Sequence, residues 1–189
     1  MSSTQTQGDL QLVRDAQRGD REAFGQLVSK YQDRLYSALT YLVGCPIEAE
    51  DLTQDAFLRA LNKLDPFRLE SSFYTWLYRI ARNLMISKKR RRTPLFCARV
   101  EDQPGLPHDE GETPLQRHQR EGRAQQTRDA LTQLDEDHRT VLLLRELEGF
   151  DYQAIADILN IPPGTVRSRL HRARNQMRRR LEHTMSDEP

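Results

Sequence analysis

The residue types best suited to chemistry lie between Phe73 and Arg92, in the segment FYTWLYRIARNLMISKKRRR. Aromatic rings can stack on bases, guanidinium groups can bind phosphates, and an amide can read a base edge. These three kinds of side chain, followed by the basic run from Lys88 to Arg92, predict contact with single-stranded nucleic acid. The alternative is a solvated helix face whose cationic end suits the helix macrodipole.

Helical spacing divides this segment into two faces. Apolar residues recur with the period of one buried stripe: Phe73, Trp76, Leu77, Ile80, Ala81 and Leu84. The positions between them are expected to point away from the core: Tyr74, Thr75, Tyr78, Arg79, Arg82 and Asn83. In the preceding turn, residues 65–72, Ser71 or Ser72 is expected to cap the helix, which leaves Phe67 and Arg68 for a ligand.

A predicted helix over residues 47–64 carries an acidic stripe. Its inward positions are Ala49, Leu52, Ala56 and Ala60. Its outer positions are Glu48, Asp51, Asp55 and Asn62, with Gln54 and Leu58 beside them. A Mg²⁺ site requires carboxylates that converge, and acids on the outside of one helix do not, so neither a metal site nor nuclease activity is predicted. A solvated face and docking to a basic partner helix remain, and Leu58 favours docking because it supplies an apolar anchor.

A helix-turn-helix is predicted near the C-terminus. The spacing of Ala156, Asn160 and Val166 suits two closely crossing helices, and Pro163 suits the first turn of the second one. The apolar stripe of that last helix is formed by Val166, Leu170, Ala173, Met177 and Leu181. Polar residues near its N-terminus are expected to meet base edges in duplex DNA: Thr165, Arg167, Ser168, His171 and Arg172. The later Arg174, Arg178, Arg179 and Arg180 are expected to face phosphates or solvent.

No catalytic residue is predicted. His171 has no nucleophile or carboxylate spaced to work with it, so a surface or DNA-contacting role is favoured over catalysis. Cys45 and Cys97 stand in no metal-binding or redox spacing, so no disulfide, zinc site or cofactor is predicted. The chain is not expected to be an enzyme.

The elements that position these residues are predicted to be helices only. Hydrophobic residues make up 37% of the chain and charged residues 30%, which suits thin helical bundles. We expect an all-α fold of two small helical domains, residues 1–92 and 122–189, joined by a flexible linker. That linker, residues 93–121, lacks helical periodicity, contains four prolines and becomes acidic.

Helix ends follow from capping and turn residues. Asp9 is expected to cap a short first helix, and Asp20 and Gly44 to bound the second. In the C-terminal half one helix is expected from Glu121 to Leu134, and Asp151 is expected to cap a short helix before the turn. Between these two, a helix capped by Asp135 and ended by Gly149 is expected to bury Val141, Leu142, Leu144, the stem of Arg145 and Leu147.

The net charge of +1 conceals two cationic regions. Residues 68–92 hold eight Lys and Arg against Glu70 alone, and residues 163–183 hold seven Arg against Glu182 alone. The N-terminus lacks a basic and apolar leader, and no window has the apolar length of a membrane span. A soluble cytoplasmic protein is therefore expected.

The order of these segments resembles bacterial RNA polymerase sigma factors of the extracytoplasmic-function group. The matching segments are DLTQDAF, DPFRLESSFYTWLYRIARN, a basic run, a linker and GTVRSRLHRAR, which together cover nearly the whole chain. The resemblance implies a subunit that binds core polymerase, recognises two promoter elements and promotes initiation. The alternative is a stand-alone helix-turn-helix regulator, a repressor or response regulator, which would require a ligand or phosphoacceptor pocket in the N-terminal half.

The resemblance also implies roles for individual residues. The helix matching residues 48–64 would dock on the clamp helices of the largest polymerase subunit through Asp51, Gln54, Asp55 and Leu58. The loop and following helix would capture a base flipped out of the minus-ten element, through Phe67, Arg68, Ser71, Ser72, Tyr74, Trp76, Arg79, Arg82, Asn83, Lys88 and Arg90. The C-terminal helix would read the minus-thirty-five element, through Thr165, Arg167, Ser168, His171 and Arg172.

Further partners and two departures accompany the resemblance. In the family the C-terminal domain also meets the polymerase flap, the linker threads toward the active site and RNA exit path, and an anti-sigma factor commonly clamps the two domains. In this chain Leu69 stands where glycine is usual in the loop. Residues 85–87 replace a segment that often carries an aspartate. Both departures bear on base preference.

Overall fold

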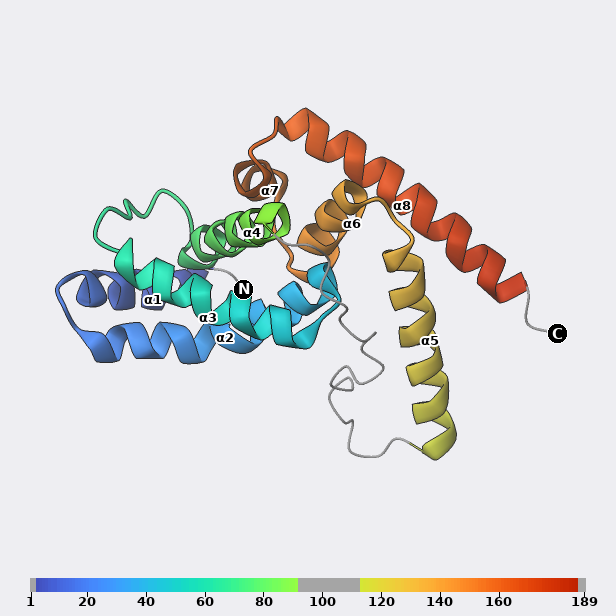
Figure 1. Ribbon diagram of the computed structural model, residues 1–189, viewed down its shortest axis with the longest axis horizontal. Coiled ribbons are helices and arrows are strands. Elements are labelled where there is room, and N and C mark those ends of the chain that lie inside the picture. The colour runs from blue at the N-terminus through green and yellow to red at the C-terminus, as the bar shows by residue number, and fades with distance from the viewer. Residues whose placement is uncertain (1–2, 92–112, 187–189) are drawn as a thin grey trace. The chain divides into compact units, whose positions relative to one another are not determined.

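The computed structural model describes residues 3–91 and 113–186, and every regular element in those ranges is helical, which confirms the predicted all-α class (Figure 1). The contacts divide the chain into two compact units, one built on helices α1–α4 and the other on α5, α6 and α8. Residues 92–112, which hold most of the predicted linker and Cys97, lie outside the described residues.

The N-terminal unit is a bundle of four helices: α1 (Ser3–Gln17), α2 (Arg21–Val43), α3 (Pro46–Asn62) and α4 (Phe73–Arg91). Helix α2 packs on α1 and α3, and α3 packs on α4. The predicted inward face of α3 is confirmed, because Ala49, Leu52, Ala56 and Ala60 are all fully buried. These mostly small side chains allow α3 to approach its neighbours closely.

Helix α2 begins and ends where its sequence predicts. The carboxylate of Asp20 accepts hydrogen bonds from the backbone N–H groups of Glu22 (2.9 Å) and Ala23 (3.2 Å). Gly44 ends the helix with φ of 70°, a left-handed conformation that glycine adopts without steric cost. Pro46 then occupies the first turn of α3, where its missing N–H leaves no bond unmade.

The prediction that Asp9 caps the first helix is wrong. Helix α1 begins earlier, at Ser3, and Asp9 lies buried in its middle. Two side chains of α2 bind its carboxylate: Lys30 Nζ lies 2.5 Å from Oδ1, and the Tyr31 hydroxyl donates to Oδ2. These partners offset the cost of burying the charge. Burial raises the pKa of Tyr31 above its ordinary range, and the hydrogen bond and charge of Asp9 raise it further.

In the C-terminal unit, α5 (Pro114–Thr132) begins seven residues before the predicted start at Glu121. The reason is a capping box at Thr113. Its side chain accepts from the Gln116 N–H at 3.3 Å, and the Gln116 side chain accepts from the Thr113 N–H at 2.9 Å. Pro114, which had indicated a linker, therefore occupies the first helical turn.

A π-helical turn, η1 (Leu143–Leu147), follows α6 (Glu136–Leu142) and overturns one burial prediction. Leu147 was expected in the core but is 50% exposed, whereas Leu143 is buried. In η1 the Glu148 N–H donates to the Leu143 carbonyl, five residues earlier. The extra residue in this turn rotates the following positions by about 100° relative to an α-helix. Gly149, with φ of 71°, ends the turn as predicted.

The predicted helix-turn-helix consists of α7 (Tyr152–Leu159) and α8 (Pro163–Ser186). Asp151 caps α7 as expected, because its carboxylate accepts from the Ala154 N–H at 2.7 Å. Asn160 takes the left-handed conformation at φ of 54°, and Pro163 starts α8. The predicted positions for close helix crossing, Ala156 and Val166, are buried. The cap, the turn residue and the crossing positions of the helix-turn-helix are thus those that the sequence predicts.

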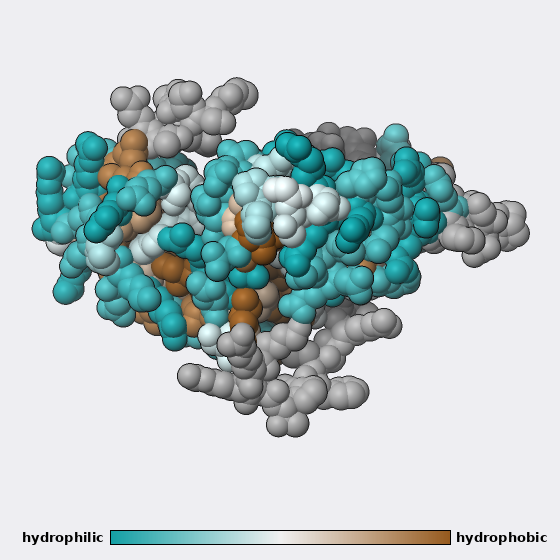
Figure 2. Space-filling view, turned by 90° about the horizontal axis from the view of Figure 1, so that it is seen from above, coloured by the Kyte–Doolittle hydropathy of each residue, from teal (hydrophilic) through white to brown (hydrophobic). Residues whose placement is uncertain are grey.

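The described surface is largely polar. Hydrophilic residues cover most of the face seen in Figure 2, and hydrophobic residues show in separate patches. The described helices include none with the length and apolarity needed to cross a bilayer. Cys45 is buried, and the other cysteine, Cys97, lies outside the described residues, as does the expectation of no disulfide.

Candidate nucleic-acid interface

The first turns of α8 present polar side chains on one side and apolar ones on the other. Val166, Leu170 and Ala173 are buried, as predicted. Four of the five predicted DNA readers are exposed: Arg167, Ser168, His171 and Arg172, while Thr165 is half-buried. Cationic and hydroxyl groups are thus gathered at the end of the helix that enters a DNA groove in helix-turn-helix proteins.

Polar contacts on its other sides hold α8 against the rest of the unit. Arg169 forms an ion pair with Asp137 at 2.7 Å. Arg174 binds one carboxylate oxygen of Glu146 through Nε at 3.0 Å and Nη2 at 2.6 Å, and this hydrogen bond raises the pKa of Arg174. Arg180 donates to the Gln133 carbonyl at 2.9 Å. Arg174 and Arg180, which were expected to face phosphates or solvent, therefore have protein partners.

The aromatic residues of α4 and its preceding loop are in the core, which corrects the predicted face. Tyr74, Thr75 and Tyr78 were expected to point away from the core, yet all three are buried. Tyr74 stacks on Tyr31 with ring centroids 5.1 Å apart and lies 6.1 Å from the ring of Tyr78. Helical periodicity missed this because aromatic rings also fill positions flanking the apolar stripe when neighbouring helices cover both sides.

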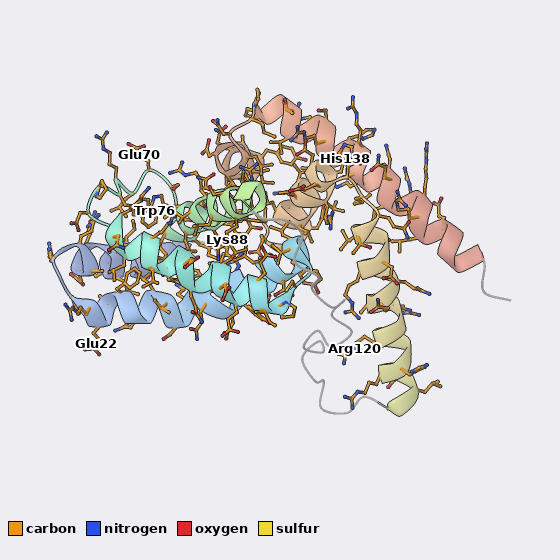
Figure 3. All side chains as sticks on the ribbon, in the orientation of Figure 1. Glu22, Glu70, Trp76, Lys88, Arg120 and His138 are labelled. Carbon is orange, nitrogen blue, oxygen red and sulfur yellow. The ribbon has the colours of Figure 1, made fainter. Side chains whose placement is uncertain are left out.

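Phe67 and Trp76 pack on each other and are not exposed to solvent. Their ring centroids lie 4.5 Å apart in a stacked arrangement, and both side chains are buried. Trp76 is labelled on α4 in Figure 3. The stack joins the loop to the helix, so these two rings support the loop and are not themselves open to a base in this conformation.

Polar groups of the predicted minus-ten set remain on the surface. Arg68, Ser72, Arg79 and Asn83 are exposed, and Ser71, Arg82 and Lys88 are half-buried. The side chain of Arg90 lies outside the described residues. The exposed members carry guanidinium, hydroxyl and amide groups, which can bind phosphates and base edges.

The loop between α3 and α4 is held at its far end by a helix cap. Ser72 Oγ accepts from the Thr75 N–H at 3.1 Å, so Ser72 is the cap that the sequence left open between Ser71 and Ser72. Leu69 has φ of 59°, which explains why glycine would suit this position. Leu69 is half-buried, and this partial burial does not explain why a leucine adopts the left-handed conformation.

The exposed face of α3 carries the predicted docking residues. Leu58 is 61% exposed, and Asp51 and Gln54 are exposed beside it. Asp55 differs, because it is half-buried and its carboxylate lies 2.9 Å from Nζ of Lys88 on α4. Sequence reasoning missed two further apolar residues on the exposed side of α3, Ile47 (74% exposed) and Leu61 (47% exposed). The signal was their spacing from Leu58, which repeats the three- and four-residue steps of a helix face.

Carboxylates do not converge on a metal-binding cluster in the parts of the chain that the structure describes. Glu48, Asp51 and Asp55 lie along one face of α3, which suits docking or solvation rather than Mg²⁺ coordination.

Comparison with known proteins identifies the family. Residues 27–94 match Sigma-70 region 2, and residues 124–177 match Sigma-70, region 4. The sequence is 40% identical to the RNA polymerase sigma-H factor of Pseudomonas aeruginosa, over 92% of this chain and 94% of that protein. It is 37% identical to the ECF RNA polymerase sigma-E factor of Haemophilus influenzae, over 94% and 97%. The chain belongs to the ECF sigma factors of the sigma-70 family.

A solved structure agrees with this assignment. The sigma factor RpoE of Bartonella quintana, solved in complex with the anti-sigma factor NepR, aligns with a TM-score of 0.66 and 30% sequence identity. The alignment covers 84% of this sigma factor and 96% of that chain. As a sigma factor, the protein serves in transcription initiation, where it binds core RNA polymerase and recognises promoter DNA. The resemblance predicted from the sequence is thereby confirmed, and the stand-alone regulator is not favoured.

Proposed function

We propose that this sigma factor contacts a promoter at two places, one with each helical unit, and that it has no catalytic activity of its own. The observation that carries the proposal is the first three turns of α8. There the apolar residues are buried, and Arg167, Ser168, His171 and Arg172 are all exposed. With Thr165, these residues form the proposed contact with the duplex minus-thirty-five element, in which arginine pairs with guanine edges.

The second contact is the loop before α4 and the adjoining face of that helix, at the minus-ten element. We propose direct contact by the exposed or half-buried polar residues: Arg68, Ser71, Ser72, Arg79, Arg82, Asn83 and Lys88, with Arg90 beyond the described side chains. The buried Phe67, Tyr74 and Trp76 support the loop and helix from beneath. Trapping a flipped base offsets an unstacking cost of a few kcal/mol.

Docking on core polymerase is assigned to the exposed face of α3. Leu58 is the apolar anchor, and Asp51, Gln54 and Asp55 form its polar surroundings. A basic helical partner, such as the clamp helices implied by the family, suits this acidic and apolar face. The C-terminal unit would meet the polymerase flap, and the segment between α4 and α5 would connect the two contacts.

Regulation by an anti-sigma factor is also proposed. The Bartonella quintana relative was solved with such a partner, and this sigma factor is similar to it along most of that chain. We expect this chain to work where bacterial polymerase works, in the cytoplasm.

The reading by α8 is tested with Arg167→Ala, with Arg179→Ala as the matched control from a later turn of the same helix. Loss of a bidentate base contact is expected to weaken binding to a matched promoter by about 1 to 3 kcal/mol and to relax specificity at one position. The control is expected to weaken binding to all sequences alike. Promoter affinity of the polymerase holoenzyme, measured against a panel of upstream elements, checks both variants. Unchanged affinity and specificity in Arg167→Ala would remove the recognition assignment.

A further inference from the structure

One hydrogen-bonding side chain links the first helix to the loop between α3 and α4. Gln17, the last residue of α1, is half-buried, and its Nε2 donates to the carbonyl oxygens of Leu64 and Phe67, each at 2.9 Å. A primary amide has two N–H groups, so both donors have a partner. The two carbonyls belong to the turn in which the Phe67 N–H also donates to the Leu64 carbonyl at 3.0 Å.

The loop is fixed at both ends, by Gln17 and an aromatic stack at its start and by a helix cap at its end. At its start the Phe67 ring stacks on Trp76, and at its end Ser72 caps α4. Between these anchors stand only residues 68–71, which are exposed or half-buried. The short span that carries Arg68 is therefore presented on a rigid base.

We propose that Gln17 is a positioning residue for DNA strand opening, and that it acts by holding the loop that presents Arg68 to the minus-ten element. This inference rests on the proposed minus-ten role of the loop. A loop that must become ordered on binding loses free energy for each side chain that it immobilises. The two hydrogen bonds donated by the Gln17 amide order the loop in the folded protein before DNA binds. Gln17 lies outside residues 27–94, the part that matches Sigma-70 region 2.

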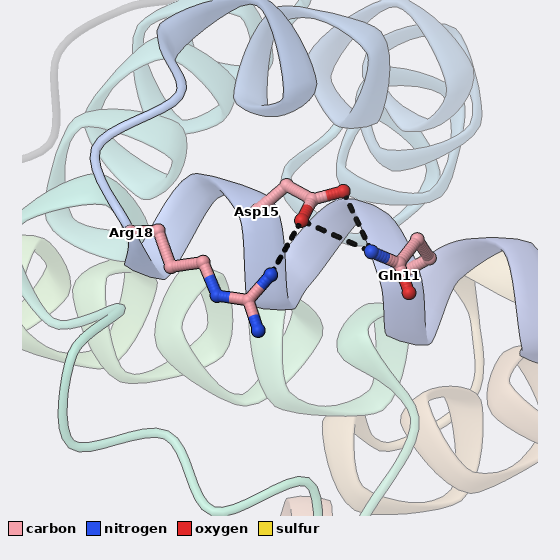
Figure 4. A network of polar contacts seen from close by, with 3 residues as sticks. All are labelled: Gln11, Asp15 and Arg18. Carbon is pink, nitrogen blue, oxygen red and sulfur yellow. Dashed lines mark hydrogen bonds and ion pairs between the residues drawn. The ribbon is translucent and has the colours of Figure 1, made fainter.

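The chemistry of the site requires a glutamine-like donor. Glutamate has the same shape but no N–H, and it would set a negative charge against two carbonyl oxygens. Gln11, on the same helix, provides a matched control. Its Nε2 donates to the two oxygens of Asp15 at 3.0 and 2.9 Å, within the exposed network of Figure 4, and Arg18 binds the same carboxylate. Removing that amide leaves the loop contacts unchanged.

The experiment compares full-length Gln17→Glu, Gln17→Ala and Gln11→Ala. Trp76 is the only tryptophan of the chain and stacks on Phe67, so its fluorescence reports on the base of the loop. Acrylamide quenching of Trp76 is expected to rise in both Gln17 variants and not in Gln11→Ala. With core polymerase and a promoter carrying 2-aminopurine in the minus-ten element, strand opening is expected to slow about two- to tenfold, as ordering one or two side chains implies. Formation of the closed complex is expected to stay unchanged.

Each outcome decides a different point. Unchanged Trp76 quenching in a folded Gln17 variant would overturn the positioning role. An equal loss of closed-complex formation and strand opening would also overturn it, because that pattern indicates general destabilisation. Increased quenching with normal opening would keep the anchor but overturn its link to opening, while the proposed minus-ten contact by Arg68 and its neighbours would be unaffected. Should Gln17→Glu not fold, Gln17→Ala removes the same donors without introducing a charge.

Discussion

Leu69 adopts a backbone conformation that suits glycine better than leucine. Its φ of 59° lies in the left-handed region, where a side chain costs about 1 to 2 kcal/mol and glycine costs nothing comparable. The loop therefore keeps the conformation that glycine would favour, although the residue is leucine. The strained residue lies within residues 68–71, the part of the loop that is proposed to contact the minus-ten element.

Replacing Leu69 by glycine and by alanine separates this strain from the loss of the leucine side chain. Both variants lose that side chain, but only alanine must still adopt the left-handed conformation. We expect Leu69→Gly to be more stable than Leu69→Ala by about 1 kcal/mol, the reverse of the order at an ordinary site. Urea unfolding followed by Trp76 fluorescence measures the difference. If Leu69→Ala proved the more stable of the two, the backbone there would not be strained.

Tyr31 couples the stability of the N-terminal unit to alkaline pH. Its pKa in the folded protein is raised above the unfolded value of about 10, so the neutral phenol is favoured by folding. This contribution is complete below pH 10 and is lost as the pH rises from there through the folded pKa. Tyr31→Phe is expected to cost about 1.5 to 3 kcal/mol at neutral pH, because the Asp9 carboxylate loses a buried donor.

The same variant should also flatten the alkaline limb of the stability curve. Phenylalanine does not titrate, so the free energy of unfolding should fall less steeply above pH 10 than it does in the parent protein. Urea midpoints between pH 7 and 11 test this, with Tyr36→Phe as the control from the same helix. Parallel curves for parent and Tyr31→Phe would show that Tyr31 does not control alkaline stability.

At the scale of elements, α3 carries different side chains on its buried and exposed faces. Its inward alanines pack in the bundle, while its outer side carries Leu58 and Asp51. Asp55 stands between these roles, because it pairs with Lys88 of α4 in a partly exposed ion pair (Lys88 is labelled in Figure 3). Charge reversal at Asp55 would set two cations together, so Asp55 is a poor probe of docking alone.

Leu58 is the better probe of the docking face. Leu58→Asp is expected to remove association with core polymerase while stability changes by no more than about 0.5 kcal/mol, because the side chain is 61% exposed. Leu115→Asp is the matched control, since this leucine of α5 is 67% exposed. Co-purification with core polymerase and a thermal unfolding curve check both variants. Normal co-purification of Leu58→Asp would leave the stripe as a solvated face.

Sequence patterns predicted the local features of these elements well and the tertiary ones poorly. Caps and turns at Asp20, Gly44, Asp151 and Asn160 follow from the chemistry of nearby residues, and all four lie where expected. By contrast, the buried Asp9 depends on side chains of another helix, as does the buried face of Tyr74 and Tyr78. The π-turn that exposes Leu147 likewise leaves no mark in a pattern with a period of 3.6 residues.

The candidate site shows the same division. Exposure of the α8 readers was predictable, because the apolar stripe of one helix fixes which residues remain outside. The support of the minus-ten loop was not predictable, since Gln17 is 47 residues from Leu64 and 50 from Phe67. A lone glutamine at a helix end carries no pattern. Its role emerges only when the fold brings two carbonyl oxygens to its amide.

At the scale of the whole molecule, the charges are sorted into two cationic regions although their sum is +1. Each region lies in a different helical unit, and each holds one proposed DNA contact. Because one chain carries both, the first contact raises the effective concentration of the second, and two weak contacts can yield one tight complex. Affinity should then fall steeply with salt, since each phosphate contact releases counterions.

A double-mutant cycle between the two units tests whether they act independently. Arg172→Ala should weaken closed-complex formation by about 1 to 3 kcal/mol, because it removes a contact with duplex DNA. Asn83→Ala should instead slow promoter melting, since its exposed amide is assigned to the separated strand. Residues without shared partners usually combine additively within about 0.3 to 0.5 kcal/mol, so the double variant should show the sum at each step. Quantitative footprinting for the closed complex and permanganate reactivity for melting give the two free energies. A coupling well above that range would mean that both units grip the promoter as one body, and the effect of Asn83 would then extend to duplex binding.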